Sequence, residues 1–119
     1  MTPQEHPPAT VSTHVLDTSA GRPARGVAVR LTVRTGEAPA VPHAQSATDD
    51  DGRCTGLPAL PPGATHATLT FVTGPYLTAV HGTPAFFPEA AVTFAVGPGQ
   101  HYHVPLLLNP FGYSVYRGS

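Results

Sequence analysis

The 119-residue sequence has no lysine, only one cysteine and no long hydrophobic run. A single cysteine rules out an internal disulfide framework, which fits a reducing compartment. No stretch approaches the roughly 18 apolar residues that a membrane-spanning helix needs. Six arginines against seven acidic residues give a net charge of −1, so the basic surface typical of nucleic-acid-binding proteins is missing. We therefore expect neither a nucleic acid nor a membrane as partner.

The amino-terminal segment also lacks the charged start and apolar centre of a secretion signal. We expect residues 1–9 to be a disordered lead-in and the protein to be cytoplasmic. The remaining residues, 10–119, are enough for one domain with its own hydrophobic core.

Glycine and proline are abundant, at 12 and 15 residues, which favours short elements joined by turns. Apolar and polar residues alternate along several segments, and this period of two predicts strands at 10–16, 27–34, 65–73, 92–96, 101–108 and 112–117. The Asp-Gly pair in the 49–52 segment predicts a hairpin turn, with a further strand beginning at Arg53. One short helix is predicted at 75–81. These elements indicate an all-β sandwich or barrel.

His101 and His103 are two residues apart on a predicted strand, so their side chains share one face. Two such imidazoles can bind a metal, share acid–base work, or simply be polar surface residues. Zinc needs further ligands, and no other histidine has supporting spacing, so we expect no metal. The opposite face of this strand is apolar, and we expect partner subunits to cover it: Val104, Leu106 and Leu108.

Several other residues have both a structural and a functional interpretation. His14 lies in the middle of the first predicted strand, where a lone histidine is usually a tolerated residue. Arg53 follows three aspartates, and taken alone it is explained by a surface ion pair with them. Those aspartates lack the ligand spacing of a calcium loop. Cys54 is more consistent with an inert residue than with a reactive thiolate. The patterned sequence continues to Ser119, so we expect the terminal carboxylate to be held near imidazoles and a guanidinium.

Taken together, six segments resemble the transthyretin-related 5-hydroxyisourate hydrolases: STHVLD at 12–17, GRPA at 21–24, DGR at 51–53, FFPE at 86–89, HYHVPLLL at 101–108 and YRGS at 116–119. They occur in order over nearly the whole chain, and the terminal tetrapeptide is the most diagnostic. Transthyretin itself, a hormone carrier of the same fold, lacks the tetrapeptide and the His/Arg/His set. Two positions depart from the family pattern, Asn109 in place of Ser and Val115 in place of Thr.

The resemblance implies a transthyretin (prealbumin)-like two-sheet β-sandwich of about eight strands, assembled as a homotetramer with active sites at the dimer–dimer interface. It implies cofactor-free hydrolysis of 5-hydroxyisourate to 2-oxo-4-hydroxy-4-carboxy-5-ureidoimidazoline. The implied catalytic residues are His14, Arg53, His103 and Ser119. Substrate binding is assigned to His14 and Arg53 together with the terminal residues Tyr116, Arg117 and Gly118.

The residues leave two other functions open. One is a non-enzymatic, transthyretin-like carrier of a small aromatic ligand, although a carrier has no need of acid–base groups. The other is a structural or adhesion module, which the absence of disulfides disfavours. Which histidine is the general base, and whether Ser119 acts through its carboxylate or its hydroxyl, are not decided by the sequence.

Overall fold

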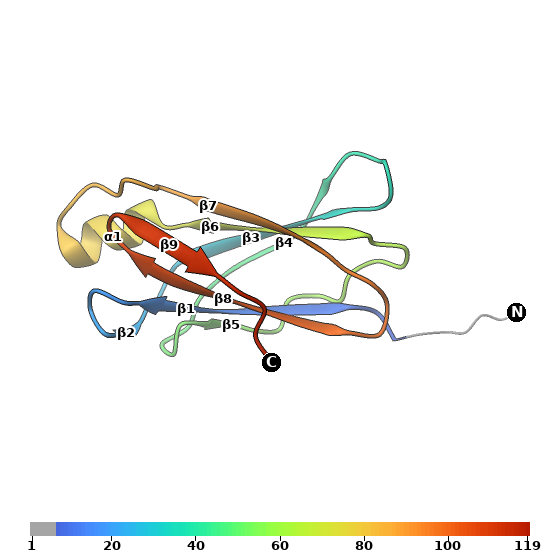
Figure 1. Ribbon diagram of the computed structural model, residues 1–119, viewed down its shortest axis with the longest axis horizontal. Helices are drawn as coiled ribbons and strands as arrows, with labels where there is room; N and C mark the ends of the chain where they lie inside the picture. The colour runs from blue at the N-terminus through green and yellow to red at the C-terminus, as the bar shows by residue number, and fades with distance from the viewer. Residues whose placement is uncertain (1–6) are drawn as a thin grey trace, which may run out of the picture.

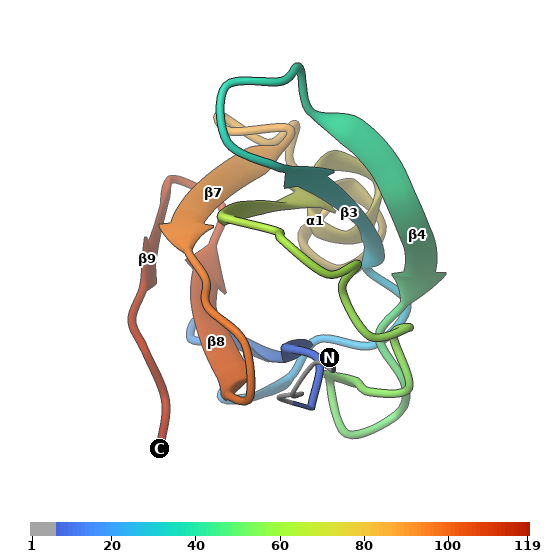
Figure 2. The same ribbon diagram turned by 90° about the vertical axis from the view of Figure 1, so that its right-hand side faces the viewer.

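The computed structural model describes residues 7–119, which form two stacked β-sheets with one short helix at one end (Figures 1 and 2). One sheet, here sheet A, has the strand order β2-β1-β8-β9, with β5 also paired to β1; sheet B has the order β4-β3-β6-β7. The elements of the described residues are β1 Thr10–Asp17, β2 Arg22–Pro23, β3 Ala28–Arg34, β4 Val41–Ala47, β5 Arg53–Cys54, β6 His66–Val72, α1 Gly74–His81, β7 Ala90–Ala95, β8 His101–Asn109 and β9 Gly112–Val115. The predicted sandwich is confirmed.

The hydrophobic core lies between the two sheets and follows the alternation of the sequence. Successive side chains of a strand point to opposite faces, so every second residue of each long strand faces the other sheet. The inward residues of β1, β3, β6 and β8 are almost completely buried: Val11, Thr13 and Val15; Val29, Leu31 and Val33; Ala67, Leu69 and Phe71; Tyr102, Val104, Leu106 and Leu108. The outward side chains of sheet A are thereby left available for chemistry.

The apolar face of β8 is covered by sheet B of the same chain. Leu106 and Leu108 are 0% and 1% exposed within a single protomer. The expectation that partner subunits cover Val104, Leu106 and Leu108 is therefore wrong, because the sandwich itself already buries this face.

Strand β4 was not predicted from the sequence. Its residues do not alternate, and most of them are exposed because β4 is an edge strand paired only with β3. Its pairing with β3 shifts register between Leu31 and Thr32, next to Pro42. A proline is tolerated at such an edge or bulge because its missing N–H is not needed for the ladder.

The 49–52 turn forms as predicted, but it does not close a hairpin. It connects β4 of sheet B to β5 of sheet A, so the strands on its two sides do not pair with each other. Gly52 has the expected positive φ of 76°. A Cβ at this position would overlap the carbonyl oxygen of Val15, which shows how closely the turn is pressed against β1.

Helix α1 confirms the predicted helix and ends at Gly82, whose φ is 68°. It packs against the end of β1, where the hydroxyl of Tyr76 and Nε2 of His81 each donate to Oδ2 of the buried Asp17 at 2.7 Å. Burial opposes ionisation of Asp17, but the N–H of Ala20 and these two donors hold its pKa below the ordinary value. Burial and the bond to Asp17 raise the pKa of Tyr76 to about 12.

No helix of the described residues is both long and apolar enough to span a membrane. Residues 1–6 of the predicted lead-in lie outside the described residues. Ala9, also assigned to the lead-in, is 6% exposed, and its carbonyl accepts a hydrogen bond from the amide of Leu60 at 2.9 Å.

Candidate active site

The outward face of sheet A brings together residues from opposite ends of the sequence. Strands β1 and β8 pair in parallel, which places Ser12 beside His103. On its other side β1 pairs with β5, which places His14 beside Arg53. His14, Arg53 and His103, three of the residues that the sequence singled out, therefore lie on one face of three neighbouring strands.

A continuous chain of hydrogen bonds runs across β1 and β8 on this face. The hydroxyl of Thr10 lies 2.7 Å from Nδ1 of His101, and Nε2 of His101 lies 2.8 Å from the hydroxyl of Ser12. The same Ser12 hydroxyl lies 2.8 Å from Nδ1 of His103. Because Nδ1 of His103 is held by Ser12, its Nε2 is the nitrogen left to face a substrate.

Arg53 and His14 are both positioned by the 49–52 turn. The carboxylate of Asp49 accepts from the amides of Asp51 and Arg53 at 2.9 Å, which fixes the turn and the start of β5. The carbonyl of Asp51 accepts a hydrogen bond from Nε2 of His14 at 2.7 Å. A carbonyl can only accept, so the proton of neutral His14 is on Nε2 and its Nδ1 carries the lone pair.

The alternative interpretation of Arg53 as a surface ion pair is not supported. Within residues 7–119, Arg53 forms no ion pair with the neighbouring aspartates, and Asp50 instead pairs with Arg25 at 2.8 Å. Arg53 is exposed on the outer face. Its guanidinium is available to bind an anion or a carbonyl oxygen.

The surroundings of His103 lower its pKa and so favour the uncharged imidazole at neutral pH. Burial, followed by the positive charges of Arg53, His101 and His14, holds its pKa below the ordinary value of 6.5. A histidine whose pKa lies below the working pH has a free lone pair and can accept a proton from a nucleophile.

The carboxy-terminal segment lies along His103. The amide of Gly118 donates to the carbonyl of His103 at 2.7 Å, and the chain passes β8 on its way to the terminus (Figure 1). A Cβ on Gly118 would lie 2.7 Å from Cδ2 of His103 and 3.3 Å from Cγ of Pro105. Ser119, exposed, follows directly, so its hydroxyl and carboxylate belong to the residue next to this contact.

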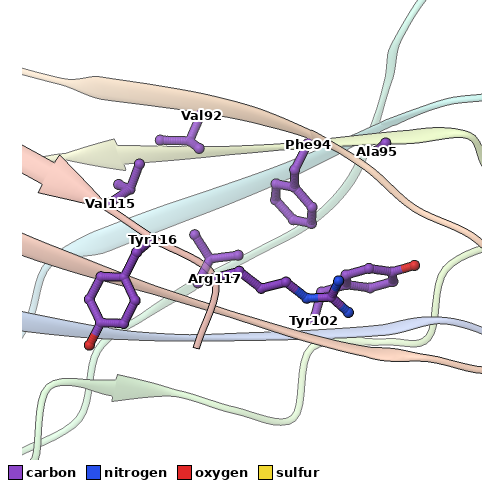
Figure 3. Close-up of a pocket in the computed structure, with 8 residues that line it drawn as sticks. Val92, Phe94, Ala95, Tyr102, Val115, Tyr116 and Arg117 are labelled. Atoms are coloured by element: carbon purple, nitrogen blue, oxygen red, sulfur yellow. The ribbon is translucent and has the colours of Figure 1, made fainter. Parts of the chain in front are cut away.

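Arg117 points to the other side of β8. Its guanidinium lies 5.0 Å from the ring centroid of Tyr102 (Figure 3). It also donates to Oε1 of Gln100 at 3.1 Å. It borders a mainly apolar pocket of about 240 Å³ at the edge of the sandwich, lined by Val92, Phe94, Ala95, Tyr102, Val104, Val115, Tyr116 and Arg117. Tyr116 is half exposed. Among the terminal residues, Gly118 contacts His103 through its backbone.

Within residues 7–119, no group of three or more His, Cys, Asp or Glu side chains is arranged to hold a metal ion. The structure adds three residues that the sequence did not assign to the site: Thr10, Ser12 and His101. Thr10 and Ser12 lie on the same face of β1 as His14, so the alternation of the sequence could have identified them as neighbours of the site. Their contact with the histidines of β8 depends on the register of a parallel strand pair, and the alternation says nothing about this register.

Comparison with known proteins gives a consistent result. The model of the HIUase/Transthyretin family matches residues 11–118. A 5-hydroxyisourate hydrolase of Mesorhizobium japonicum is 42% identical over 118 residues, covering 92% of this chain and 91% of the relative. The structure of Klebsiella pneumoniae 5-hydroxyisourate hydrolase superposes with a TM-score of 0.76 at 39% identity, covering 93% and 99% of the two chains. Sparus aurata transthyretin gives a TM-score of 0.81 at 29% identity, covering 91% and 95%. The chain belongs to the HIUase/transthyretin family.

Proposed function

We propose that this protein hydrolyses 5-hydroxyisourate to 2-oxo-4-hydroxy-4-carboxy-5-ureidoimidazoline, a step of urate degradation, without a cofactor. The observation that carries the proposal is the convergence of His14, Arg53 and His103 on one sheet face of a chain similar to 5-hydroxyisourate hydrolases. Water must attack a ring carbonyl, which requires a group that takes a proton, a group that stabilises an oxyanion and a group that orients a small planar ring.

In the proposed mechanism, His103 takes the proton from the attacking water. Its Nδ1 is bound to Ser12, so Nε2 is the basic atom, and its lowered pKa keeps it uncharged at neutral pH. Arg53 binds the carbonyl oxygen on which negative charge develops. His14, whose Nδ1 is the free acceptor, orients the water or a ring N–H of the substrate.

The terminal residues complete the proposed site. Ser119 adds a hydroxyl and a carboxylate one residue beyond the contact of Gly118 with His103, and in the proposed mechanism this carboxylate stabilises the imidazolium that forms during the reaction. We also assign Tyr116, Arg117 and Gly118 to substrate binding. Of these, Gly118 packs on the ring of His103. The guanidinium of Arg117 is directed to Tyr102 instead, so Arg117 contributes by holding the terminal segment in its position.

We further propose a cytoplasmic homotetramer with the active sites at the dimer–dimer interface. The outer face of sheet A leaves Arg53 exposed and His14 and His103 half-buried in a single protomer. Charge stabilisation by Arg53 is much weaker in water than in an enclosed pocket. A second subunit over this face would exclude water. Light scattering at micromolar concentration tests the assembly, and a stable monomer would contradict it.

The decisive experiment is to add freshly prepared 5-hydroxyisourate and follow its loss by ultraviolet absorbance against the uncatalysed decay. We expect a clear acceleration that His103→Ala and His14→Ala each reduce by ~10²–10⁴-fold, the usual cost of removing a positioned acid–base group. An unaccelerated decay would favour the second candidate, a carrier of a small aromatic ligand, which the high structural similarity to Sparus aurata transthyretin supports.

A further inference from the structure

The role of His101 follows from the hydrogen-bond chain on the outer face of sheet A, and the inference rests on the proposed role of His103 as the base. We propose that His101, acting through the hydroxyl of Ser12, is a positioning residue that sets the tautomer of His103 and receives the proton that His103 takes up.

Ser12 has one hydroxyl proton, and this limits the protons of the hydrogen-bond chain to two arrangements. Its single hydroxyl proton can be donated to His101 or to His103, but not to both. When Ser12 donates to Nε2 of His101, Nδ1–H of His103 donates to Ser12, and Nε2 of His103 is a bare base. When Ser12 donates to Nδ1 of His103, the proton of neutral His103 is on Nε2, from which it can be donated as Ser12 transfers its own proton to Nδ1.

The hydroxyl of Thr10 adapts to either arrangement at the other end of the chain. In the first arrangement it accepts from Nδ1–H of His101, and in the second it donates to Nδ1. Thr10 and His101 are solvent-accessible, so this end exchanges protons with water. The two arrangements therefore differ only in the direction of every hydrogen bond, and no heavy atom has to move.

The proton taken up in the reaction drives the change from the first arrangement of the hydrogen bonds to the second. Nε2 of His103 accepts a proton from the attacking water, which forms an imidazolium. The Nδ1–H bond of His103 then breaks as a bond to Oγ of Ser12 forms, and the former hydroxyl proton of Ser12 forms a bond to Nε2 of His101. The positive charge moves to the more exposed His101. His103 is left neutral with its proton on Nε2. It gives this proton to the leaving nitrogen of the opened ring while the Ser12 hydroxyl returns a proton to Nδ1 and Nε2–H of His101 returns one to Ser12, which restores the first arrangement with both histidines neutral.

Electrostatics favour moving the charge away from His103. Arg53 of β5 and His14 of β1 face His103 and oppose its positive charge, as does a protonated His101 on β8. Ser119, which follows Gly118 in the terminal segment, carries the terminal carboxylate. Transfer to His101 increases the distance of the charge from Arg53 and brings it closer to solvent.

The first test measures tautomers directly and does not depend on activity. In ¹⁵N-labelled protein at neutral pH, long-range ¹H–¹⁵N correlation spectra should show the proton of His103 on Nδ1. Ser12→Ala should abolish this preference, whereas Ser12→Thr, which keeps the hydroxyl, should retain it. Finding His103 protonated on Nε2 in the wild-type protein would overturn the inference, whatever the hydrolysis assay shows.

The second test separates tautomer control from proton acceptance. His101→Gln keeps an acceptor for the Ser12 hydroxyl but cannot take a proton, so it should preserve the His103 tautomer and lower kcat by ~10-fold or more with little change in KM. His101→Phe removes a positive neighbour and should in addition move the acid limb of the kcat profile to higher pH. His66→Gln, on sheet B, is the matched control and should change neither.

A wild-type kcat and an unshifted acid limb in His101→Phe would overturn the relay. Absence of hydrolysis by the wild-type protein would instead overturn the proposed function, and the tautomer spectra would still report on the hydrogen-bond chain.

Discussion

The most direct test of the site geometry is Gly118→Ala, because it adds one methyl group at the ring of His103. The new Cβ would lie 2.7 Å from Cδ2 of His103, whereas carbon atoms in contact are ordinarily ~3.5–4.0 Å apart. The ring must therefore shift by roughly 1 Å or the terminal segment must move away. The φ angle of Gly118 lies outside the left-handed region, so alanine adds a steric clash without backbone strain.

A shift of this size breaks the hydrogen bond that orients His103. The Ser12 hydroxyl lies 2.8 Å from Nδ1 of His103, and another ~1 Å exceeds the range of a hydrogen bond. A misplacement of ~1 Å of a catalytic group costs up to ~10²-fold in rate. We therefore expect Gly118→Ala to reduce kcat/KM for 5-hydroxyisourate by ~10–100-fold, while the thermal midpoint stays near that of the parent because the terminal segment adds little to the core.

Gly112→Ala is the matched control, since it adds the same methyl group near the same terminus. Its nearest neighbours, the amide atoms of Asn109, would lie 3.8 Å and 3.9 Å from the new Cβ, which is ordinary contact. Ultraviolet kinetics and thermal unfolding of both variants decide the question. If Gly118→Ala kept the kcat/KM of the parent, the contact between the terminal segment and His103 would have no role in catalysis.

Three further predictions concern charge and the terminus. Arg53→Gln removes a positive charge near His103, so the pKa of His103 should rise and the acid limb of the pH profile of kcat/KM should move to higher pH. A reduced rate with an unmoved acid limb would show that Arg53 acts only on the substrate. Extending the chain beyond Ser119 converts its carboxylate to an amide and should abolish most hydrolysis without unfolding, which full activity of the tagged protein would refute. Asp17→Ala should lower the free energy of unfolding by about 3 kcal/mol in chemical denaturation, since it leaves the partly buried donors Tyr76 and His81 without their acceptor. Because the folded pKa of Asp17 is depressed, its contribution is complete above the unfolded value of 3.8 and is lost as pH falls through the lower folded value.

Strands were predictable from the sequence wherever one face of the strand is buried and the other is exposed to solvent. Under that condition burial imposes a period of two, as in β3 and β6, and the predicted inward residues are the observed core. Strand β4 was missed because it is an edge strand with little burial on either face, so its sequence carries no such period. Its formation depends on the hydrogen-bond ladder that β3 offers, which is a tertiary condition.

The sequence was sufficient to select the residues of the candidate site, but not to predict the hydrogen bonds between them. Imidazoles and an arginine in segments that resemble a hydrolase family were sufficient to select His14, Arg53 and His103. The bridge through Ser12 depends on the parallel pairing of β1 with β8, which joins residues about 90 positions apart. The alternation decides which face each residue occupies, but shifts of the register by two residues preserve that pattern, and the alternation does not predict which strands pair. His101 therefore remained unassigned until the pairing was known.

The contrast between the edge pocket and the outer face of sheet A is the reason that we propose the latter as the place of the reaction. The pocket offers about 240 Å³ of mainly apolar space with one guanidinium, which is already engaged with Tyr102 and Gln100. It has volume but no base. On the outer face, three segments act on the imidazole of His103. Ser12 of β1 binds its Nδ1, burial and then Arg53 of β5 lower its pKa, and Gly118 of the terminal segment packs against its ring. Acid–base catalysis requires control of proton, charge and position at the same atom, and among the described residues His103 has all three.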